Sequence, residues 1–112
     1  MLYASKAHLI NENLFILESI RVIVYPTELK LDVGLTANFN CSIHGGPFTS
    51  ITWRKDMTTL KNNPRAAFPT PTSLQVRQLR RQDSGIYQCF VGRDEVSEQA
   101  SARLVIGGEY CM

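Results

Sequence analysis

The strongest constraint on the fold is that Cys41, Trp53, Tyr87 and Cys89 all lie on the apolar side of short alternating stretches. Apolar and polar residues alternate strictly from 35 to 43, and Cys41 falls on the apolar side. A period of two is typical of a β-strand with one buried face. Trp53 takes the inner parity of the next stretch, and Tyr87 and Cys89 take that of a later one. The sequence therefore predicts two cysteines and two large aromatic rings facing one core.

Turn-forming residues divide the rest of the chain into further short stretches of the same kind. Leu74, Val76 and Leu79 form one apolar set, and alternate residues from 100 to 106 form another after a polar hairpin at 92–95. All five prolines fall outside the central strands. A proline within such a strand would remove one N–H from the hydrogen bonds that join it to its neighbours. Short strands at this spacing, with no convincing helix between them, predict an all-β fold.

Size and charge limit the chain to one domain with few classes of partner. The 112 residues are enough for one hydrophobic core but not for two. Twelve basic residues against ten acidic ones leave a net charge of +2, far from the dense basic face of a nucleic-acid-binding protein. Polar residues interrupt every apolar run well before the roughly 18 residues that a membrane-spanning helix needs. We therefore expect no nucleic acid partner and no membrane span within this chain.

Residues that could carry catalysis or bind a metal are sparse. The two histidines, His8 and His44, lie in no catalytic motif, and 44–46 is interpreted as a turn because no G-x-S-x-G follows it. The three cysteines lack the paired C-x-x-C spacing of a structural zinc site. Cys41 and His44 have a spacing that a metal could use, but Cys41 faces the core. We expect no enzyme activity, no metal, no cofactor and no small-molecule substrate.

The first 20 residues differ from the remainder of the chain. They show neither clean alternation nor a capped helix, and Asn11, Glu12 and Asn13 divide the apolar run that a signal peptide would need. We expect 1–20 to be an extension of doubtful structure, 21–106 to be the folded domain and 107–112 to be an exit linker or chain end. Cys111, beyond the domain, is either a feature of the chain end or a reactive thiol.

The spacing of the four inward residues resembles that of an immunoglobulin domain. Trp53 follows Cys41 by twelve residues, and Tyr87 and Cys89 end the run Asp83-Ser84-Gly85-Ile86-Tyr87-Gln88-Cys89. The resemblance implies a two-sheet Greek-key sandwich with a single inter-sheet disulfide between Cys41 and Cys89, with Trp53 packed on it and Tyr87 at the corner between two strands. It also implies a salt bridge from Arg65 to Asp83. The short stretch between Trp53 and Leu74, itself a core residue, favours the intermediate (I-set) type.

A narrower resemblance is to the Dscam family of arthropod neuronal receptors. It is carried by Tyr87-Gln88-Cys89-Phe90-Val91, Ala100-Ser101-Ala102, Leu104 and the exit Gly107-Gly108. It implies an extracellular domain of an alternatively spliced plasma-membrane receptor. Such a domain mediates homophilic cell adhesion in axon guidance and dendrite self-avoidance, with like receptor chains and adjacent immunoglobulin domains as partners. Two alternatives remain open, namely a passive spacer in a multi-domain protein and a secreted immune recognition module.

Two outer faces compete as the contact surface. One displays Arg54, Gln88, Phe90 and Arg103, and the other displays Asn38, Asn40, Gln75 and Arg77. An outward aromatic such as Phe90 is either an interface anchor or a ring covered by a neighbouring arginine, Arg54 or Arg103.

The sequence also contains one modification motif and one unusual turn residue. Asn40-Cys41-Ser42 satisfies the N-glycosylation sequon, and parity points Asn40 outward, although a position in mid-strand beside a cysteine is an awkward acceptor. The turn after Lys55-Asp56 has Met57 where related domains usually have Gly, which puts the geometry of that hairpin in question.

Overall fold

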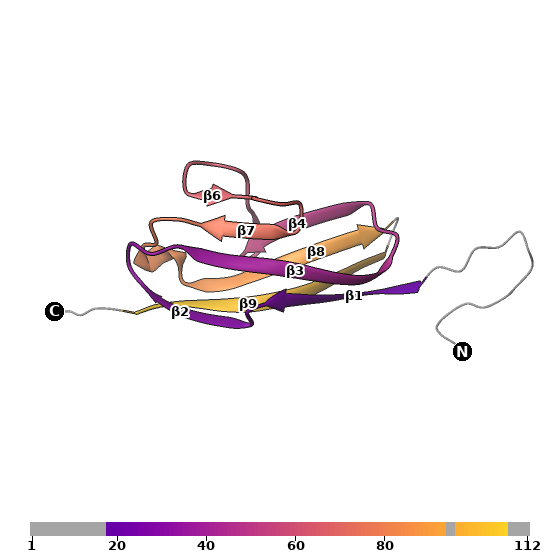
Figure 1. Cartoon of the computed structure of the whole chain (residues 1–112), viewed down its shortest axis with the longest axis horizontal. Helices are drawn as coiled ribbons and strands as arrows, with labels where there is room; N and C mark the ends of the chain where they lie inside the picture. The colour runs from indigo at the N-terminus through magenta and orange to yellow at the C-terminus, as the bar shows by residue number, and fades with distance from the viewer. Residues whose placement is uncertain (1–17, 94–95, 108–112) are drawn as a thin grey trace, which may run out of the picture.

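The chain folds into two β-sheets packed face to face (Figure 1). The computed structural model describes residues 18–93 and 96–107. The four-stranded sheet has the order β1 (Glu18–Tyr25), β3 (Ala37–Gly46), β7 (Ser73–Val76), β6 (Ala66–Ala67). The five-stranded sheet has the order β2 (Glu28–Asp32), β9 (Val96–Gly107), β8 (Gly85–Arg93), β4 (Ser50–Lys55), β5 (Thr58–Thr59). The predicted all-β sandwich is confirmed.

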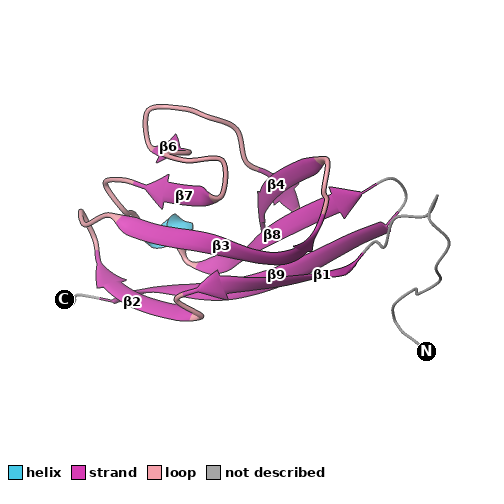
Figure 2. Cartoon of the chain, turned by 45° about the vertical axis from the view of Figure 1, so that its right-hand side comes forward, coloured by secondary structure: helices cyan, strands magenta, loops and turns pink. Residues whose placement is uncertain are grey.

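The chain passes repeatedly from one sheet to the other, as Figure 2 shows with the strands in magenta. Pro26 and Thr27 separate β1, at the edge of the four-stranded sheet, from β2, at the edge of the five-stranded sheet. Strand β2 runs parallel to β9, and every other pairing is antiparallel. The parallel pair places β2, near the start of the domain, beside β9, its last strand.

The core lies between the sheets and follows the alternation of the sequence. The four-stranded sheet contributes Val24, Ala37, Phe39, Cys41, Leu74 and Val76, and the five-stranded sheet contributes Trp53, Tyr87, Cys89, Val91, Ala102 and Leu104. The rings of Phe39 and Tyr87 stack across the interior with centroids 5.4 Å apart. Large rings suit this position because the facing sheets lie about 10 Å apart.

A disulfide joins the two sheets at the centre of this core. Cys41 on β3 and Cys89 on β8 are bonded, with their Cα atoms 6.3 Å apart and a sequence separation of 48. Trp53 lies directly opposite Cys89 in the register of β4 and β8 and is 2% exposed. The single inter-sheet disulfide implied by the resemblance is therefore confirmed.

The first strand begins earlier than the sequence suggested. Strand β1 starts at Glu18, and the side chain of Ile20 is buried in the core. Residues 18–20, assigned to the doubtful extension, thus belong to a strand. Their place in the sheet comes from pairing with β3 and not from an alternation of apolar and polar residues in their own sequence. The remaining residues of the extension, 1–17, lie outside the described residues, as do 108–112 and with them Cys111.

The hairpin between β4 and β5 has two residues at positive φ. Asp56 has φ 46° and Met57 has φ 77°, the combination that a two-residue type I′ hairpin requires. Met57 is 79% exposed, so its side chain packs against little of the domain. The hairpin therefore forms without the glycine that usually relieves this conformation, and Met57 carries the steric strain of a side chain in the left-handed region.

Candidate functional site

A buried carboxylate organises the corner between β7 and β8. Asp83 is 7% exposed and lies in a one-turn 3₁₀ helix, η1 (Arg81–Asp83). Arg65 donates to both carboxylate oxygens, from Nη1 at 2.8 Å and from Nη2 at 3.2 Å. The backbone N–H of Arg80 donates to Oδ2 at 2.7 Å, and the hydroxyl of Tyr87 donates to the carbonyl oxygen of Asp83 at 2.7 Å. We call Arg65, Arg80, Asp83 and Tyr87 the corner network.

The electrostatics of the corner network hold Asp83 in its charged form. Burial pushes the pKa of Asp83 upward, but the hydrogen bonds from Arg65 and from the Arg80 N–H, with the charge of Arg65, outweigh it and leave the pKa below its usual value. Burial also raises the pKa of Tyr87 well above its ordinary value. The carboxylate of Asp83 and the hydroxyl of Tyr87 are both engaged in hydrogen bonds within the corner. Such groups are suited to holding the corner in place rather than to transferring a proton.

A second polar contact fixes the β4–β5 hairpin to β8. The carboxylate of Asp56 accepts a hydrogen bond from the Ile86 N–H at 3.0 Å, and the Asp56 N–H donates to the Ile86 carbonyl oxygen at 3.0 Å. Lys55 lies 2.8 Å from the same carboxylate. Gly85 has φ +152°, and a Cβ there would come within 2.5 Å of the Asp56 carboxylate. The glycine thus leaves room for the acidic side chain.

The outer face of the five-stranded sheet carries a cation over an aromatic ring. The guanidinium carbon of Arg54, on β4, lies 4.2 Å from the centroid of Phe90, on β8. Both side chains are half-buried. The Nε of Arg54 is buried and makes no hydrogen bond within residues 18–93 and 96–107. Phe90 therefore presents an arginine-capped ring, and the capping arginine retains unused hydrogen-bonding capacity.

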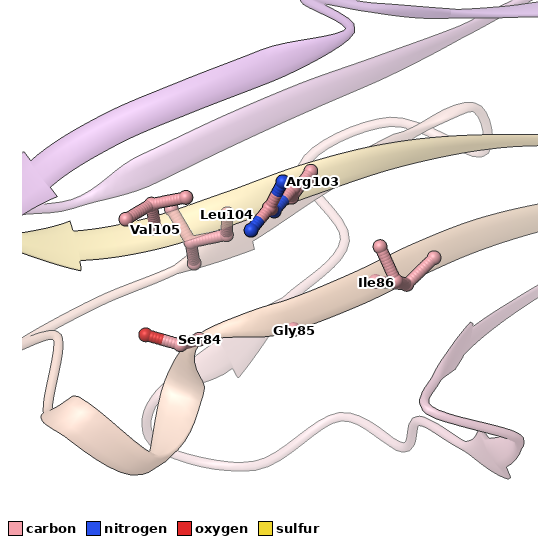
Figure 3. Close-up of a pocket in the computed structure, with 6 residues that line it drawn as sticks. All are labelled: Ser84, Gly85, Ile86, Arg103, Leu104 and Val105. Carbon is pink, nitrogen blue, oxygen red and sulfur yellow. The ribbon is translucent and has the colours of Figure 1, made fainter.

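The four residues predicted for this face do not form one cluster. Gln88 lies opposite Arg54 in the register and donates to Gln99 on β9 at 3.0 Å, so it belongs with the Arg54–Phe90 pair. Arg103 lies opposite Ile86, further along the same two strands. There it borders a hollow of about 470 Å³ (Figure 3). We call Arg54, Gln88 and Phe90 the Phe90 patch and treat Arg103 as a residue of the neighbouring hollow.

The hollow beside the Phe90 patch combines apolar and polar walls. Its lining residues are Ser84, Gly85, Ile86, Arg103, Leu104 and Val105. Ile86 is 40% exposed there, and the Ser84 hydroxyl accepts a hydrogen bond from the Ile106 N–H at 3.1 Å. The hollow is open and shallow, which suits contact with another protein surface. Its serine accepts a backbone hydrogen bond and is not placed as a nucleophile.

The outer face of the four-stranded sheet is mostly polar. Gln75 donates to Asn38 at 2.9 Å and accepts from Arg77 at 2.9 Å, forming a chain of side-chain hydrogen bonds across β3 and β7. Asn40 is exposed on the same face. Two apolar residues that the sequence analysis missed, Ile23 (43% exposed) and Tyr25 (57% exposed), flank it on β1. The pairing of β1 with β3 was the missing signal, because it alone places them beside Asn40.

Groups that could support catalysis are few in the described part of the chain. His44 lies 3.3 Å from the Ser42 hydroxyl in an exposed position, with no acidic residue in the contact. Over residues 18–93 and 96–107, no three of His, Cys, Asp and Glu lie close enough to hold a metal ion. Over the same residues, no helix has the length and apolar character needed to cross a membrane.

Two sheets with this strand order, a disulfide between β3 and β8 and a tyrosine bonded to the corner define the immunoglobulin fold. Comparison with protein families gives the type within that fold. The model of the immunoglobulin I-set domain matches residues 20–106. The chain therefore belongs to the immunoglobulin I-set family, the type expected from the short stretch between Trp53 and Leu74.

Similar proteins include large cell-adhesion molecules. The chain is 32% identical over 85 residues to "Cell adhesion molecule Dscam1" of Drosophila melanogaster, which covers 76% of this chain and 4% of that protein. It is 31% identical over 85 residues to the "Peroxidasin homolog" of Mus musculus, covering 75% of this chain and 6% of that protein. A crystal structure of the four N-terminal Ig domains of Dscam1 isoform 4.44 superposes with a TM-score of 0.71 at 30% identity, over 81% of this chain and 21% of that one. The likeness to Dscam immunoglobulin domains is thus found in sequence and in structure.

Proposed function

We propose that this chain is an extracellular immunoglobulin domain of a Dscam-like receptor that takes part in cell adhesion and recognition by protein contact and has no chemistry of its own. The proposal draws on the likeness to Dscam1, of which the matched region spans only 4%. Its partners are like receptor chains bound homophilically across opposed membranes. The biological setting is the neuronal cell surface, with roles in axon guidance and dendrite self-avoidance, and with alternative splicing supplying isoforms.

The observation that carries the proposal is the Phe90 patch. Arginine and aromatic residues contribute much of the binding energy of many protein interfaces. They lie there in well-packed pockets from which the surrounding weaker contacts exclude water. Arg54 is held over Phe90 at 4.2 Å and has a buried Nε with no partner among the described residues. A partner surface can bring an acceptor to the terminal Nη groups of this guanidinium, whereas the buried Nε lies out of its reach. The hollow at Arg103, with the exposed Ile86, extends the same face.

The placement of the first and last strands of the domain supports a tandem array with adjacent immunoglobulin domains. Strand β1 begins at one end of the sandwich, and β9 ends at the other (Figure 1). A domain entered and left at opposite ends can be joined to its neighbours in a line. Several weak modules then bind together, and avidity replaces high affinity in any one of them.

The direct test is sedimentation equilibrium of the oxidised chain up to millimolar concentration. We expect reversible self-association that Phe90→Ala and Arg54→Ala weaken. Gln75→Ala, a change at a half-buried position on the other outer face, is the matched control and should leave association unaltered. Equal weakening by all three variants would count against the assignment to this face.

A passive spacer in a multi-domain protein is the second candidate, and the cover over Phe90 favours it. Because the guanidinium of Arg54 already shields one face of the ring, less apolar surface is left for a partner than a bare phenylalanine would give. A spacer would remain monomeric at every concentration in the sedimentation experiment. The two candidates therefore predict opposite results from the same measurement.

A further inference from the structure

Asn40 occupies the middle of an open sheet face. It lies on β3, with Tyr25 of β1 opposite it on one side and Ser73 of β7 on the other. Both Asn40 and Tyr25 are exposed, and Ser73 is small. No charged side chain lies directly opposite Asn40 in either pairing. Asn40 therefore has a small neighbour on one side and an exposed tyrosine ring on the other, and its own side chain is open to solvent.

The amide of Asn40 is little used by the fold. Its Oδ1 accepts one long hydrogen bond, 3.5 Å, from the Thr72 hydroxyl, and its Nδ2 makes none within the described residues. Asn38, two residues earlier on the same face, differs because its Oδ1 holds Gln75 at 2.9 Å. Asn40 is also the one asparagine of the sequence that meets the N-x-[ST] rule, through Ser42. The acceptor motif and the uncommitted amide thus coincide.

An apolar strip lies beside this amide. Tyr25 is 57% exposed directly opposite Asn40, and Ile23 is 43% exposed directly opposite Ser42. These two exposed side chains form a small apolar surface on a polar face, on which another group can pack. The C–H face of a sugar ring is suited to packing on a tyrosine ring while its hydroxyls stay in water.

We infer that Asn40 is an N-glycosylation site and that the first sugars of the attached glycan lie over Tyr25 and Ile23. The inference rests on the extracellular location in the proposed function, because the modification occurs in the secretory pathway. Nδ2 forms a bond to C1 of the sugar as the bond from C1 to a pyrophosphate-linked lipid carrier breaks. The amide loses one proton, and the lipid pyrophosphate leaves. Transfer takes place on the extended chain, before Cys41 pairs with Cys89.

The glycan would decide between the two outer faces. An oligosaccharide at the centre of the four-stranded sheet keeps a protein partner away from Asn38, Gln75 and Arg77. The outer face of the five-stranded sheet, which has no sequon, stays open. Glycosylation at Asn40 thereby directs recognition to the Phe90 patch.

The test is expression of the full chain, with a secretion signal supplied, in animal cells. We expect the secreted protein to carry one enzyme-removable oligosaccharide, seen as a mass loss on treatment with peptide-N-glycosidase and as Asp at position 40 afterwards. Asn40→Gln and Ser42→Ala should abolish the mass loss, whereas Ser42→Thr and the matched control Asn38→Gln should retain it. A secreted, oxidised wild-type chain with no sugar would overturn the inference.

Oxidative footprinting of Tyr25 tests the contact without any variant. We expect Tyr25 to react several-fold more slowly in the glycosylated chain than after enzymatic removal of the glycan. Equal reactivity would contradict the packing of sugar on this strip. Bacterially produced chain, which has no glycan, serves for the sedimentation experiment. Loss of glycosylation with self-association intact would overturn only this inference, and glycosylation of a strictly monomeric chain would overturn only homophilic binding.

Discussion

The corner network and the Phe90 patch both place an arginine against a partner, but the two arginines are satisfied to different degrees. Arg65 makes two hydrogen bonds to a carboxylate that also receives a backbone N–H. Arg54 lies over an aromatic ring and has a buried Nε without a partner among the described residues. The hydrogen bonds of the corner are thus satisfied within the domain, whereas the guanidinium of Arg54 is held by a ring contact and keeps one nitrogen without an acceptor among the described residues.

The difference separates residues that hold the fold from residues available to recognition. Removing one member of a buried charge pair strands the other charge and is strongly destabilising. Removing one member of a half-exposed cation–π pair costs about 0.5–1 kcal/mol, because both groups keep access to water. Substitutions at the corner should therefore change stability, and substitutions at the patch should change association.

Asp83→Ala is expected to have the largest effect on stability. It leaves the guanidinium of Arg65 without its carboxylate and frees the Arg80 N–H, and we expect a loss of about 3 kcal/mol in the free energy of unfolding. Urea denaturation measures the change. A loss below about 1 kcal/mol would show that water replaces the carboxylate and that the corner is not what holds this end of the sandwich.

Gly85→Ala should have the next largest effect. Gly85 has φ +152°, and the added Cβ would meet the Asp56 carboxylate, which the Ile86 N–H holds in place. We expect a loss of about 2 kcal/mol from backbone strain and displaced hydrogen bonding. The double variant Gly85→Ala, Asp56→Ala separates the two causes, because it removes the clash and keeps the strain.

Acid should destabilise the corner to a smaller extent than Asp83→Ala does, since the side chain remains in place. The folded pKa of Asp83 lies below the value of an unfolded aspartate, about 3.9, so its contribution is fully present above that pH. The contribution is lost as the pH falls through the folded pKa. Asp56, whose pKa is lowered by the hydrogen bonds from Lys55 and the Ile86 N–H, acts in the same direction.

Unfolding free energies measured from pH 7 to pH 2 test the acid effect. Asp83→Asn should flatten the part of the curve below about pH 4, because it removes the group that titrates there. An unchanged slope in Asp83→Asn would assign the acid loss to other carboxylates.

Met57→Gly is expected to stabilise the domain by about 1 kcal/mol. A side chain in the left-handed region carries a steric cost of about 1–2 kcal/mol, part of which is offset by the greater entropy of unfolded glycine. Met57 is 79% exposed, so little packing is lost. Thermal unfolding measures the gain. A decrease in melting temperature would mean that the exposed methionine makes a contact that stabilises the hairpin.

Phe90→Ala should have the smallest effect on stability and the largest on association. The ring is half-buried and loses one cation–π contact, so we expect a loss of about 1 kcal/mol or less in unfolding free energy. Chemical denaturation should place it well below Asp83→Ala. A loss as large as that of Asp83→Ala would make Phe90 a structural residue and remove the contrast between the two regions.

The sequence predicted those features that depend on side-chain parity. The alternation around Cys41 and Cys89, with the spacing to Trp53, was enough to predict the sandwich and, through the family resemblance, the disulfide. The contact between Arg65 and Asp83 was reached in the same way, from matching positions rather than from geometry.

Features that depend on the pairing of strands distant in sequence could not be predicted from the sequence. Parity placed Arg103 on the correct face but gave no position along the strands, and the register puts it opposite Ile86, away from Phe90. Tyr25 and Ile23 lie beside Asn40 because β1 pairs with β3, and the sequence does not show that pairing. Ile20 was assigned to the extension because residues 1–20 show no clean alternation of apolar and polar residues. In each case the deciding information is a contact distant in sequence.

The central claim is that recognition uses the outer face of the five-stranded sheet. The most direct measurement is a set of ¹H–¹⁵N correlation spectra of the oxidised, unglycosylated chain across a dilution series. We predict concentration-dependent shifts at Arg54, Gln88, Phe90 and their neighbours on β4, β8 and β9, with the corner network unchanged. Shifts confined to the outer residues of β1, β3 and β7, or spectra independent of concentration up to the millimolar range, would contradict the account.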